Sequence, residues 1–195
     1  MKVLNLASIV PYTESEGPGK RFALWVQGCL KRCTGCCNPH MFEIAPRHIV
    51  TCDMVFEQIL QVNDTNSLDG VTFLGGEPML QAKGLSYLAR QCSEEGFSVM
   101  VFTGYTLHEL RQIHLPGVDE LIHFTDLLIS GPYVRDCPDT VRNWVGSRNQ
   151  RLHFLTPRYM PGVEYDPAFS QRVEFRIGQN GQLQMNGEPI IINLK

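Results

Sequence analysis

The sequence predicts an α/β protein with a partial, open barrel and a C-terminal β-hairpin, on three observations. Short β-rich apolar runs alternate with helical patterns over residues 1–155, which is typical of βαβ units and a parallel sheet. These residues are too few for a closed barrel of eight units, which usually needs about 250 residues. Residues 173–177 and 182–185 then flank Asn180 and Gly181, a strong hairpin signal.

The chain begins with strand-like segments. Residues 1–11 hold a short apolar stretch broken by polar residues and a proline, which favours a first strand over a membrane span or a cleaved leader. Residues 22–27 form the next β-rich run and lead directly into a group of cysteines. Residues 51–62 are predicted to be helical, because Val55, Ile59 and Val62 share one face.

The middle of the chain continues the alternation. Residues 70–74 form an apolar strand that ends in two glycines. Residues 81–95 place apolar side chains at helical spacing, with Cys92 on the buried face, and Gly96 suits the end of that helix. Residues 97–102 return as a strand.

A third helix and a further strand complete the core. Thr106 and Glu109 have the spacing of a capping box at a helix start, and residues 126–129 form the next buried strand. No repeat, low-complexity tract or linker interrupts the chain. We therefore expect a single domain over residues 1–195, with the barrel core in 1–155 and a β-rich extension in 156–195.

Composition excludes several classes of protein. With 43% hydrophobic and 19% charged residues, the chain has enough apolar material for a core, so neither disorder nor a coiled coil is expected. A formal net charge of −3 and the absence of a basic run argue against nucleic acid as a partner, and no segment resembles a membrane span. Seven cysteines, four of them within nine residues, indicate a reducing cytoplasm and a metal or redox site.

The cysteine group directly follows a predicted strand and carries the chemistry. Cys29, Cys33 and Cys36 have Cys-x3-Cys-x2-Cys spacing, so three thiolates can hold three irons of a [4Fe–4S] cluster and leave one iron open to a small molecule. Structural zinc on the same cysteines with His40 is the alternative. Cys37 could replace Cys36 or form a disulfide with it, although the gaps favour Cys36 as the ligand.

The segment of residues 17–39 resembles the opening of radical S-adenosylmethionine (SAM) enzymes. The resemblance is closest to the activating enzymes of glycyl-radical proteins, in particular the anaerobic ribonucleoside-triphosphate reductase activating protein family. It extends over about residues 17–155 through matches in the same order, namely Gly75-Gly76-Glu77-Pro78, Thr103-Gly104-Tyr105-Thr106, Gly131-Pro132-Tyr133 and Gly146 to Arg151. The ordered set is far more specific than any single motif.

The resemblance implies an open (β/α)6-type radical SAM barrel with a [4Fe–4S] cluster and SAM as cofactors. It implies that the SAM-binding residues are Gly75, Gly76, Glu77, Pro78, Thr103, Gly104 and Ser130, and that the cluster ligands are Cys29, Cys33 and Cys36. No side chain is expected to act as a catalyst, because the cofactors carry the radical chemistry. Ser130 and Gly35 depart from the wider superfamily, in which an acidic residue and an aromatic residue are usual.

The implied function is activation of a partner protein. Reductive cleavage of SAM would give a 5′-deoxyadenosyl radical that abstracts a hydrogen atom from a backbone glycine, with an anaerobic ribonucleotide reductase as the partner and a flavodoxin- or ferredoxin-type electron donor. A radical SAM enzyme acting on a small molecule or peptide, such as a 7-carboxy-7-deazaguanine synthase, is one alternative. A non-catalytic zinc or iron–sulfur binding module is the other.

The polar segment before residue 155 allows two interpretations. Arg148, Asn149 and Arg151 form no more than a solvated turn, or residues 146–151 border the barrel opening together with the hairpin and contact the partner.

Overall fold

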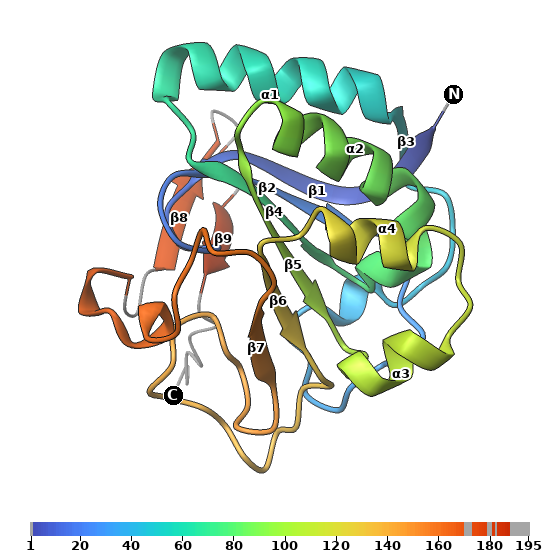
Figure 1. Ribbon diagram of the computed structural model, residues 1–195, viewed down its shortest axis with the longest axis vertical. Helices are drawn as coiled ribbons and strands as arrows, with labels where there is room; N and C mark the ends of the chain where they lie inside the picture. The colour runs from blue at the N-terminus through green and yellow to red at the C-terminus, as the bar shows by residue number, and fades with distance from the viewer. Residues whose placement is uncertain (1, 170–172, 179–180, 182, 188–195) are drawn as a thin grey trace.

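The predicted apolar strands form the middle of one open, seven-stranded sheet in the computed structural model, which describes residues 2–169, 173–178, 181 and 183–187 (Figure 1). Its strands are β1 (Val3–Thr13), β2 (Arg21–Val26), β3 (His48–Thr51), β4 (Gly70–Gly75), β5 (Ser98–Thr103), β6 (Leu127–Ser130) and β7 (Arg151–Phe154). The spatial order is β3-β1-β2-β4-β5-β6-β7. The four strands β2, β4, β5 and β6 run parallel, and antiparallel strands complete both sides. The α/β class and the open sheet are therefore confirmed.

In the described part of the chain four α-helices accompany the sheet, namely α1 (Cys52–Asn66), α2 (Ala82–Glu94), α3 (Leu107–Gln112) and α4 (Val118–His123). Thr51 caps α1 by accepting a hydrogen bond from the Met54 N–H. The capping box predicted for α3 is confirmed, since Thr106 and Glu109 each bond to the backbone of the other. Gly96 follows α2 with a φ of +86°, as expected for the end of a helix.

Alternation along the parallel strands divides the core into two faces. Phe22, Leu24 and Val26 of β2 join the large cluster that includes the buried residues of α1 and α2, whereas Ala23 and Trp25 belong to a second cluster. The helix-side cluster also contains Cys92, which is fully buried, so its predicted core position is confirmed. One face of the sheet is thus covered by helices and the other packs against loops.

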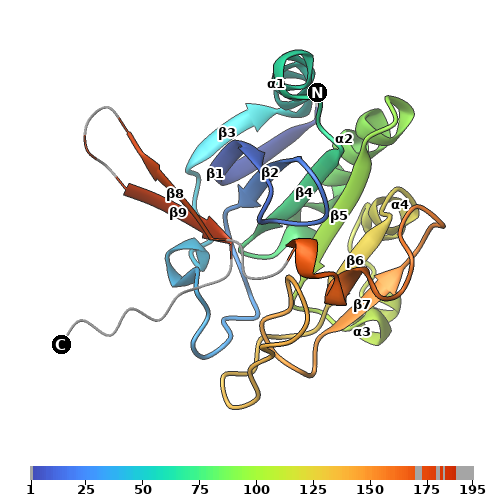
Figure 2. The ribbon, with the colours of Figure 1, turned by 90° about the vertical axis from the view of Figure 1, so that its left-hand side faces the viewer.

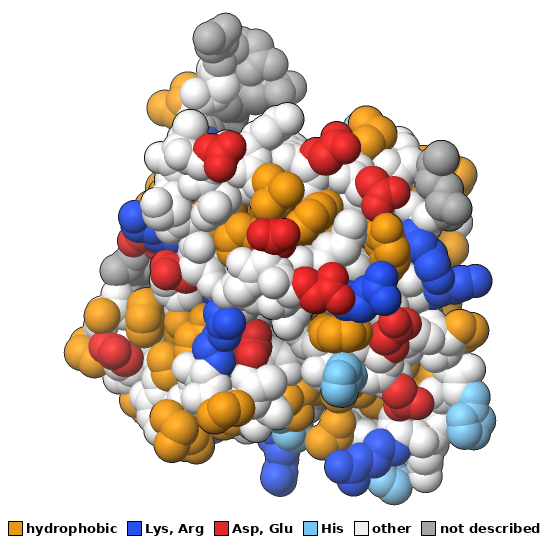
Figure 3. All heavy atoms as spheres, turned by 45° about the horizontal axis from the view of Figure 1, so that its top comes forward, with side chains coloured by type: hydrophobic (Ala, Val, Ile, Leu, Met, Phe, Trp, Pro, Cys, Tyr) orange, Lys and Arg blue, Asp and Glu red, His pale blue; other side chains and the backbone are white. Residues whose placement is uncertain are grey.

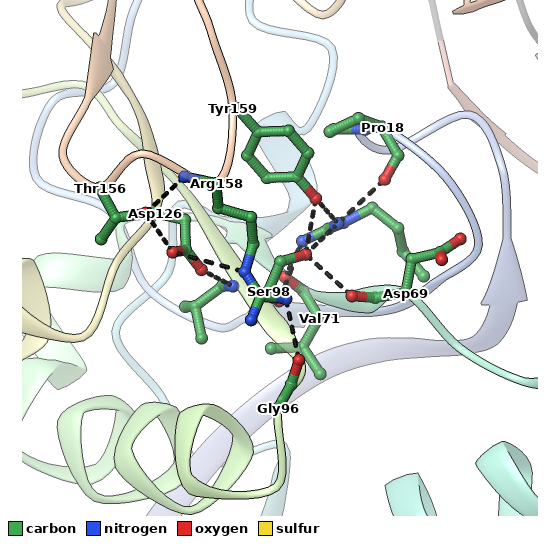
Figure 4. A network of polar contacts seen from close by, with 11 residues as sticks. Pro18, Asp69, Val71, Gly96, Ser98, Asp126, Thr156, Arg158 and Tyr159 are labelled. Atoms are coloured by element: carbon green, nitrogen blue, oxygen red, sulfur yellow. Dashed lines mark hydrogen bonds and ion pairs between the residues drawn. The ribbon is translucent and has the colours of Figure 1, made fainter.

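A buried arginine forms a hydrogen-bond network at the amino ends of the parallel strands, on the second face of the sheet (Figure 4). Arg21, at the start of β2, is fully buried and donates to Thr72, Ser98 and Tyr159 as well as to the carbonyls of Pro18 and Val71. Tyr159 also donates to Ser98. The network ties three strands to the loop before β2 and to the segment that follows β7.

The predicted C-terminal hairpin is confirmed within the described residues as β8 (Val173–Ile177) and β9 (Leu183–Gly187), while Asn180 of its turn lies outside them. Figure 2 shows the hairpin projecting from the body of the protein. Its attachment is polar: Asn186 Nδ2 donates to Thr13 Oγ1 (3.0 Å) and Ser15 Oγ (2.7 Å), and the Gly187 N–H donates to Glu16 Oε1 (2.6 Å). The pKa of Glu16 is raised by burial.

Three short elements were not predicted, namely β3, β7 and α4. Each has four or six residues, too few for a clear periodicity. Figure 3 brings the top of Figure 1 forward and shows charged side chains of both signs interspersed with apolar ones. None of the helices in the described part of the chain has the length and hydropathy needed to cross a bilayer.

Candidate active site at the carboxyl ends of the parallel strands

The sequence motifs meet at one edge of the sheet. Parallel pairing sets Val26 of β2 beside Gly75 of β4, and Thr103 of β5 beside Ser130 of β6. The segments that follow these four strands therefore leave the sheet at the same edge, which is where open α/β sheets bind ligands. We call residues 28–38, which follow β2, the cysteine loop.

The two glycines after β4 allow the chain to pack directly on the cysteine loop. The Gly76 N–H donates to Val26 O (2.8 Å), and the Glu77 N–H donates to Gly28 O (2.8 Å). A Cβ atom at position 76 would lie 2.2 Å from Gly28 O, so any side chain would push the two segments apart. Gly75 has a φ of +120°, which also favours glycine.

Glu77 is the polar centre of this edge. Its carboxylate is buried and accepts hydrogen bonds from Thr103 Oγ1 (2.7 Å), the Gly104 N–H (2.8 Å) and the Met79 N–H (3.0 Å). Burial raises its pKa to about 7, although these donors oppose the rise. The carboxylate thus joins the segment after β4 to the segment after β5.

Lys31 ties the cysteine loop to the same place. Its Nζ lies 2.8 Å from Glu109 Oε1 and 4.2 Å from the centre of the Tyr105 ring. Glu109 in turn accepts from the Thr106 N–H (2.6 Å), so one carboxylate both caps α3 and holds the lysine. The pKa of Glu109 is lowered, chiefly by the Lys31 hydrogen bond.

The cysteines of the loop differ in environment. Cys29 is buried, which raises its pKa, while the backbone N–H groups of Lys31 and Arg32 face its sulfur and oppose the rise. Cys36 accepts a hydrogen bond from Cys37, and this lowers the pKa of Cys36 to about 6 and raises that of Cys37. The hydrogen bond thus favours the thiolate form at Cys36 over Cys37.

The thiols of the cysteine loop do not converge on one point. Among the described residues, no three His, Cys, Asp or Glu side chains are arranged to hold a single ion. In a cluster each thiolate binds its own iron, and the sulfurs need not converge on one point. N–H groups directed at Cys29 and at Cys36, where Asn38 N lies 3.4 Å from Sγ, suit bound thiolates.

The turn after β6 is held by the polar segment that precedes and enters β7. Asn149 Nδ2 donates to Pro132 O (2.7 Å) and Gln150 Nε2 donates to Gly131 O (3.1 Å). Asn149 is therefore an exposed turn residue whose side chain also supports the turn after β6. Arg148 and Arg151 are exposed, and the described residues provide no ion pair for either side chain.

Ser130 lies buried at the end of β6, and its hydroxyl is 2.8 Å from His153 Nε2. His153 had no predicted role. Its pKa is lowered by burial and by the nearby cations Arg151 and Arg111. A neutral histidine can accept from the serine, so this pair joins β6 to β7 beside Thr103.

The residues that sequence reasoning missed at this edge are Lys31, Tyr105, Glu109 and His153. The sequence marks Glu109 only as part of a helix cap, and nothing local marks Lys31 as its partner 78 residues away. Cys52 and Cys92 are both fully buried on the helix side, and burial raises the pKa of each. Neither takes part in the site.

Comparisons with known proteins identify relatives of this chain. Residues 15–153 match the model of a family described as a 4Fe-4S single cluster domain. The chain is 31% identical over 157 residues to the anaerobic ribonucleoside-triphosphate reductase-activating protein of Escherichia coli (strain K12), covering 78% of this chain and 99% of that protein. Proteins of the same name from Vibrio cholerae and Enterobacteria phage T4 are 29% and 28% identical over 78% and 76% of this chain, and 99% and 93% of their own lengths.

Proposed function

The chain belongs to the 4Fe-4S single cluster domain family and to the anaerobic ribonucleoside-triphosphate reductase-activating proteins, and on that premise we propose that it is a radical SAM enzyme that installs a glycyl radical on an anaerobic ribonucleotide reductase. The observation that carries the proposal is the meeting of four motifs at one edge of the sheet, where the buried Glu77 carboxylate joins the segment after β4 to the segment after β5. The open sheet is then a shortened (β/α)6-type barrel.

Cys29, Cys33 and Cys36 are the proposed cluster ligands. They lie on one loop whose start is fixed by the hydrogen bonds of the Gly28 N–H to Met41 O (2.9 Å) and of the Cys29 N–H to Phe42 O (3.3 Å). When bound, the cluster and SAM supply reductive cleavage of the sulfonium to a 5′-deoxyadenosyl radical. The electrons would come from a flavodoxin- or ferredoxin-type donor in a reducing cytoplasm.

The residues that follow β4, β5 and β6 are the proposed SAM contacts. Gly75 and Gly76 let the segment after β4 pack closely against Val26 and Gly28, and Pro78 begins a short 3-10 helix that turns the chain back to α2. Glu77 would attract the SAM amino group and also holds Thr103 and Gly104 in place. Ser130, paired with His153, would contact SAM at the same edge of the sheet. The protein's part is to orient the substrate and exclude water.

The partner would enter through the unclosed side of the sheet. A glycine within another protein needs a wide opening, and the sheet ends in the antiparallel edge strand β7. Arg148 and Arg151 precede and begin this strand, exposed and without ion pairs among the described residues. We assign them to partner contact, because surface cations steer association with an acidic partner surface.

Anaerobic reconstitution tests the proposal. Iron and sulfide analysis should give a [4Fe–4S] cluster, and reductant with SAM should release 5′-deoxyadenosine and methionine. Zinc without iron, or iron without SAM cleavage, would defeat the enzyme interpretation and favour a binding module. Release of 5′-deoxyadenosine that depends on a small molecule or peptide, and not on the reductase, would favour the other alternative.

The partner contact needs its own comparison. Arg148→Ala with Arg151→Ala should weaken radical transfer to the reductase and leave SAM cleavage intact. Arg90→Ala, an exposed arginine on α2, is the control and should change neither. An equal loss of both activities in the double variant would contradict the assignment.

A further inference from the structure

Arg135 reaches the cysteine loop from the segment that follows β6. A Cβ atom at Gly35 would lie 2.5 Å from Arg135 Nε, 3.2 Å from Cζ and 3.1 Å from Nη2, so the guanidinium lies against the loop next to Cys36. Gly35 has a φ of +81°, which disfavours a side chain there independently of the arginine. The space beside Gly35, which a side chain at that position would need, is occupied by the Arg135 guanidinium.

The charges around the loop are not equivalent. Lys31 is neutralised by Glu109 at 2.8 Å, and the Arg32 guanidinium lies over the Phe42 ring at 5.9 Å. Arg135 makes no ion pair and no side-chain hydrogen bond with any residue that the structure describes, although Asp136 follows it directly. An exposed arginine normally remains in water or pairs with a carboxylate. Its placement on the loop therefore adds a positive charge next to Gly35 and the third cysteine, in addition to that of Arg32, which also has no ion pair among the described residues.

We propose that Arg135 is a positioning residue that makes the cluster of this enzyme easier to reduce. The inference rests on the proposed function, because it requires a [4Fe–4S] cluster on Cys29, Cys33 and Cys36. Such a cluster with three thiolates carries one negative charge when oxidised and two when reduced. A nearby cation stabilises the state with the larger negative charge, so it raises the reduction potential.

Solvent limits how far the Arg135 charge can shift the reduction potential of the cluster. Arg135 is exposed, so the interaction is weaker than it would be in a dry interior, and salt screens it further. We expect removal of the charge to reduce the equilibrium constant for reduction about tenfold, which equals about 59 mV for a one-electron couple.

The test is a reduction potential measured by electron paramagnetic resonance during anaerobic titration of the reconstituted full-length protein. Arg135→Gln should lower the potential by about the amount above, and Arg135→Lys should keep most of the wild-type value because it keeps the charge. Arg47→Gln removes another exposed arginine whose side chain has no ion pair among the described residues, and it serves as the matched control, with little shift expected. Equal shifts in all three variants, or no shift in Arg135→Gln, would overturn the proposal.

Ionic strength provides a second measurement that needs no variant. If the local cation dominates, the wild-type potential falls as salt rises, and this fall is absent in Arg135→Gln. If the net negative charge of the protein determines the salt dependence, the wild-type reduction potential rises or stays constant as salt is added, and that result also overturns the proposal. This measurement on the wild type is sufficient even if Arg135→Gln does not assemble a cluster. A wild-type protein with no [4Fe–4S] signal would instead defeat the proposed function itself.

Discussion

Replacing Glu77 with glutamine should change how the stability of the protein depends on pH. The Glu77 carboxyl is fully buried, and its pKa is raised from 4.5 to about 7, chiefly by burial. At about 1.4 kcal/mol per pH unit, this rise corresponds to about 3 kcal/mol between the two protonation states. The folded state binds the proton of the Glu77 carboxyl more tightly than the unfolded state does. The contribution of this proton to the free energy of unfolding is therefore complete below pH 4.5 and is lost as pH rises through 7.

Glutamine cannot ionise, so the Glu77→Gln variant lacks this contribution. The amide also cannot accept from both Thr103 Oγ1 and the Gly104 N–H through one oxygen, and one orphaned donor costs about 1–3 kcal/mol at every pH. The cost of the orphaned donor lowers the free energy of unfolding of the variant equally at every pH. The loss of the Glu77 titration changes how steeply that free energy depends on pH. Between pH 5 and pH 8 the wild type should lose about 3 kcal/mol of unfolding free energy relative to the variant.

Urea unfolding of the cluster-free, reduced protein at pH 5, 6, 7 and 8 measures this difference, and a constant m-value confirms that the transitions are comparable. Glu109→Gln is the control with the opposite sign, because the pKa of Glu109 is lowered and its contribution is lost as pH falls through the folded pKa. Parallel curves for the wild type and Glu77→Gln would refute the account of Glu77 as a buried, proton-binding carboxyl.

Further predictions concern the residues that position the site. Arg21→Lys has too few donors for the network in Figure 4 and should cost about 3 kcal/mol in urea unfolding, whereas Tyr159→Phe should cost about 1 kcal/mol; equal losses would contradict the network. Gly76→Ala should lower the iron bound per chain, because its Cβ would displace the cysteine loop at Gly28; a full cluster in this variant would show that the close packing is not needed. Thr106→Ala should cost about 1 kcal/mol through loss of the α3 cap, and no loss would mean that Lys31 alone holds Glu109.

Much of the core could be predicted from local pattern. The strand runs, the Thr106 capping box and the buried position of Cys92 depend on residues close in sequence, and all three agree with the structure. The parallel arrangement also predicts that the motifs meet at one edge, because each follows a strand of the same direction.

The remaining features depend on pairs that local pattern does not reveal. Arg21 meets Tyr159 from 138 residues away, and its sequence context marks it only as part of a loop before a strand. The contact between Arg135 and Gly35 requires the segment after β6 to approach the cysteine loop after β2. Edge strand β7 has only four residues, which is too few for a recognisable pattern. The contact of Asn149, just before β7, with the turn after β6 likewise joins residues that are distant in sequence.

The most direct test of the central claim is an electron paramagnetic resonance spectrum of the reductase after anaerobic incubation with this protein, SAM and a low-potential reductant. The account predicts a glycyl-radical doublet on the reductase, formed together with 5′-deoxyadenosine, and absent when Cys29, Cys33 or Cys36 is replaced by serine. A fully assembled cluster that cleaves SAM but leaves no radical on the reductase would contradict the account.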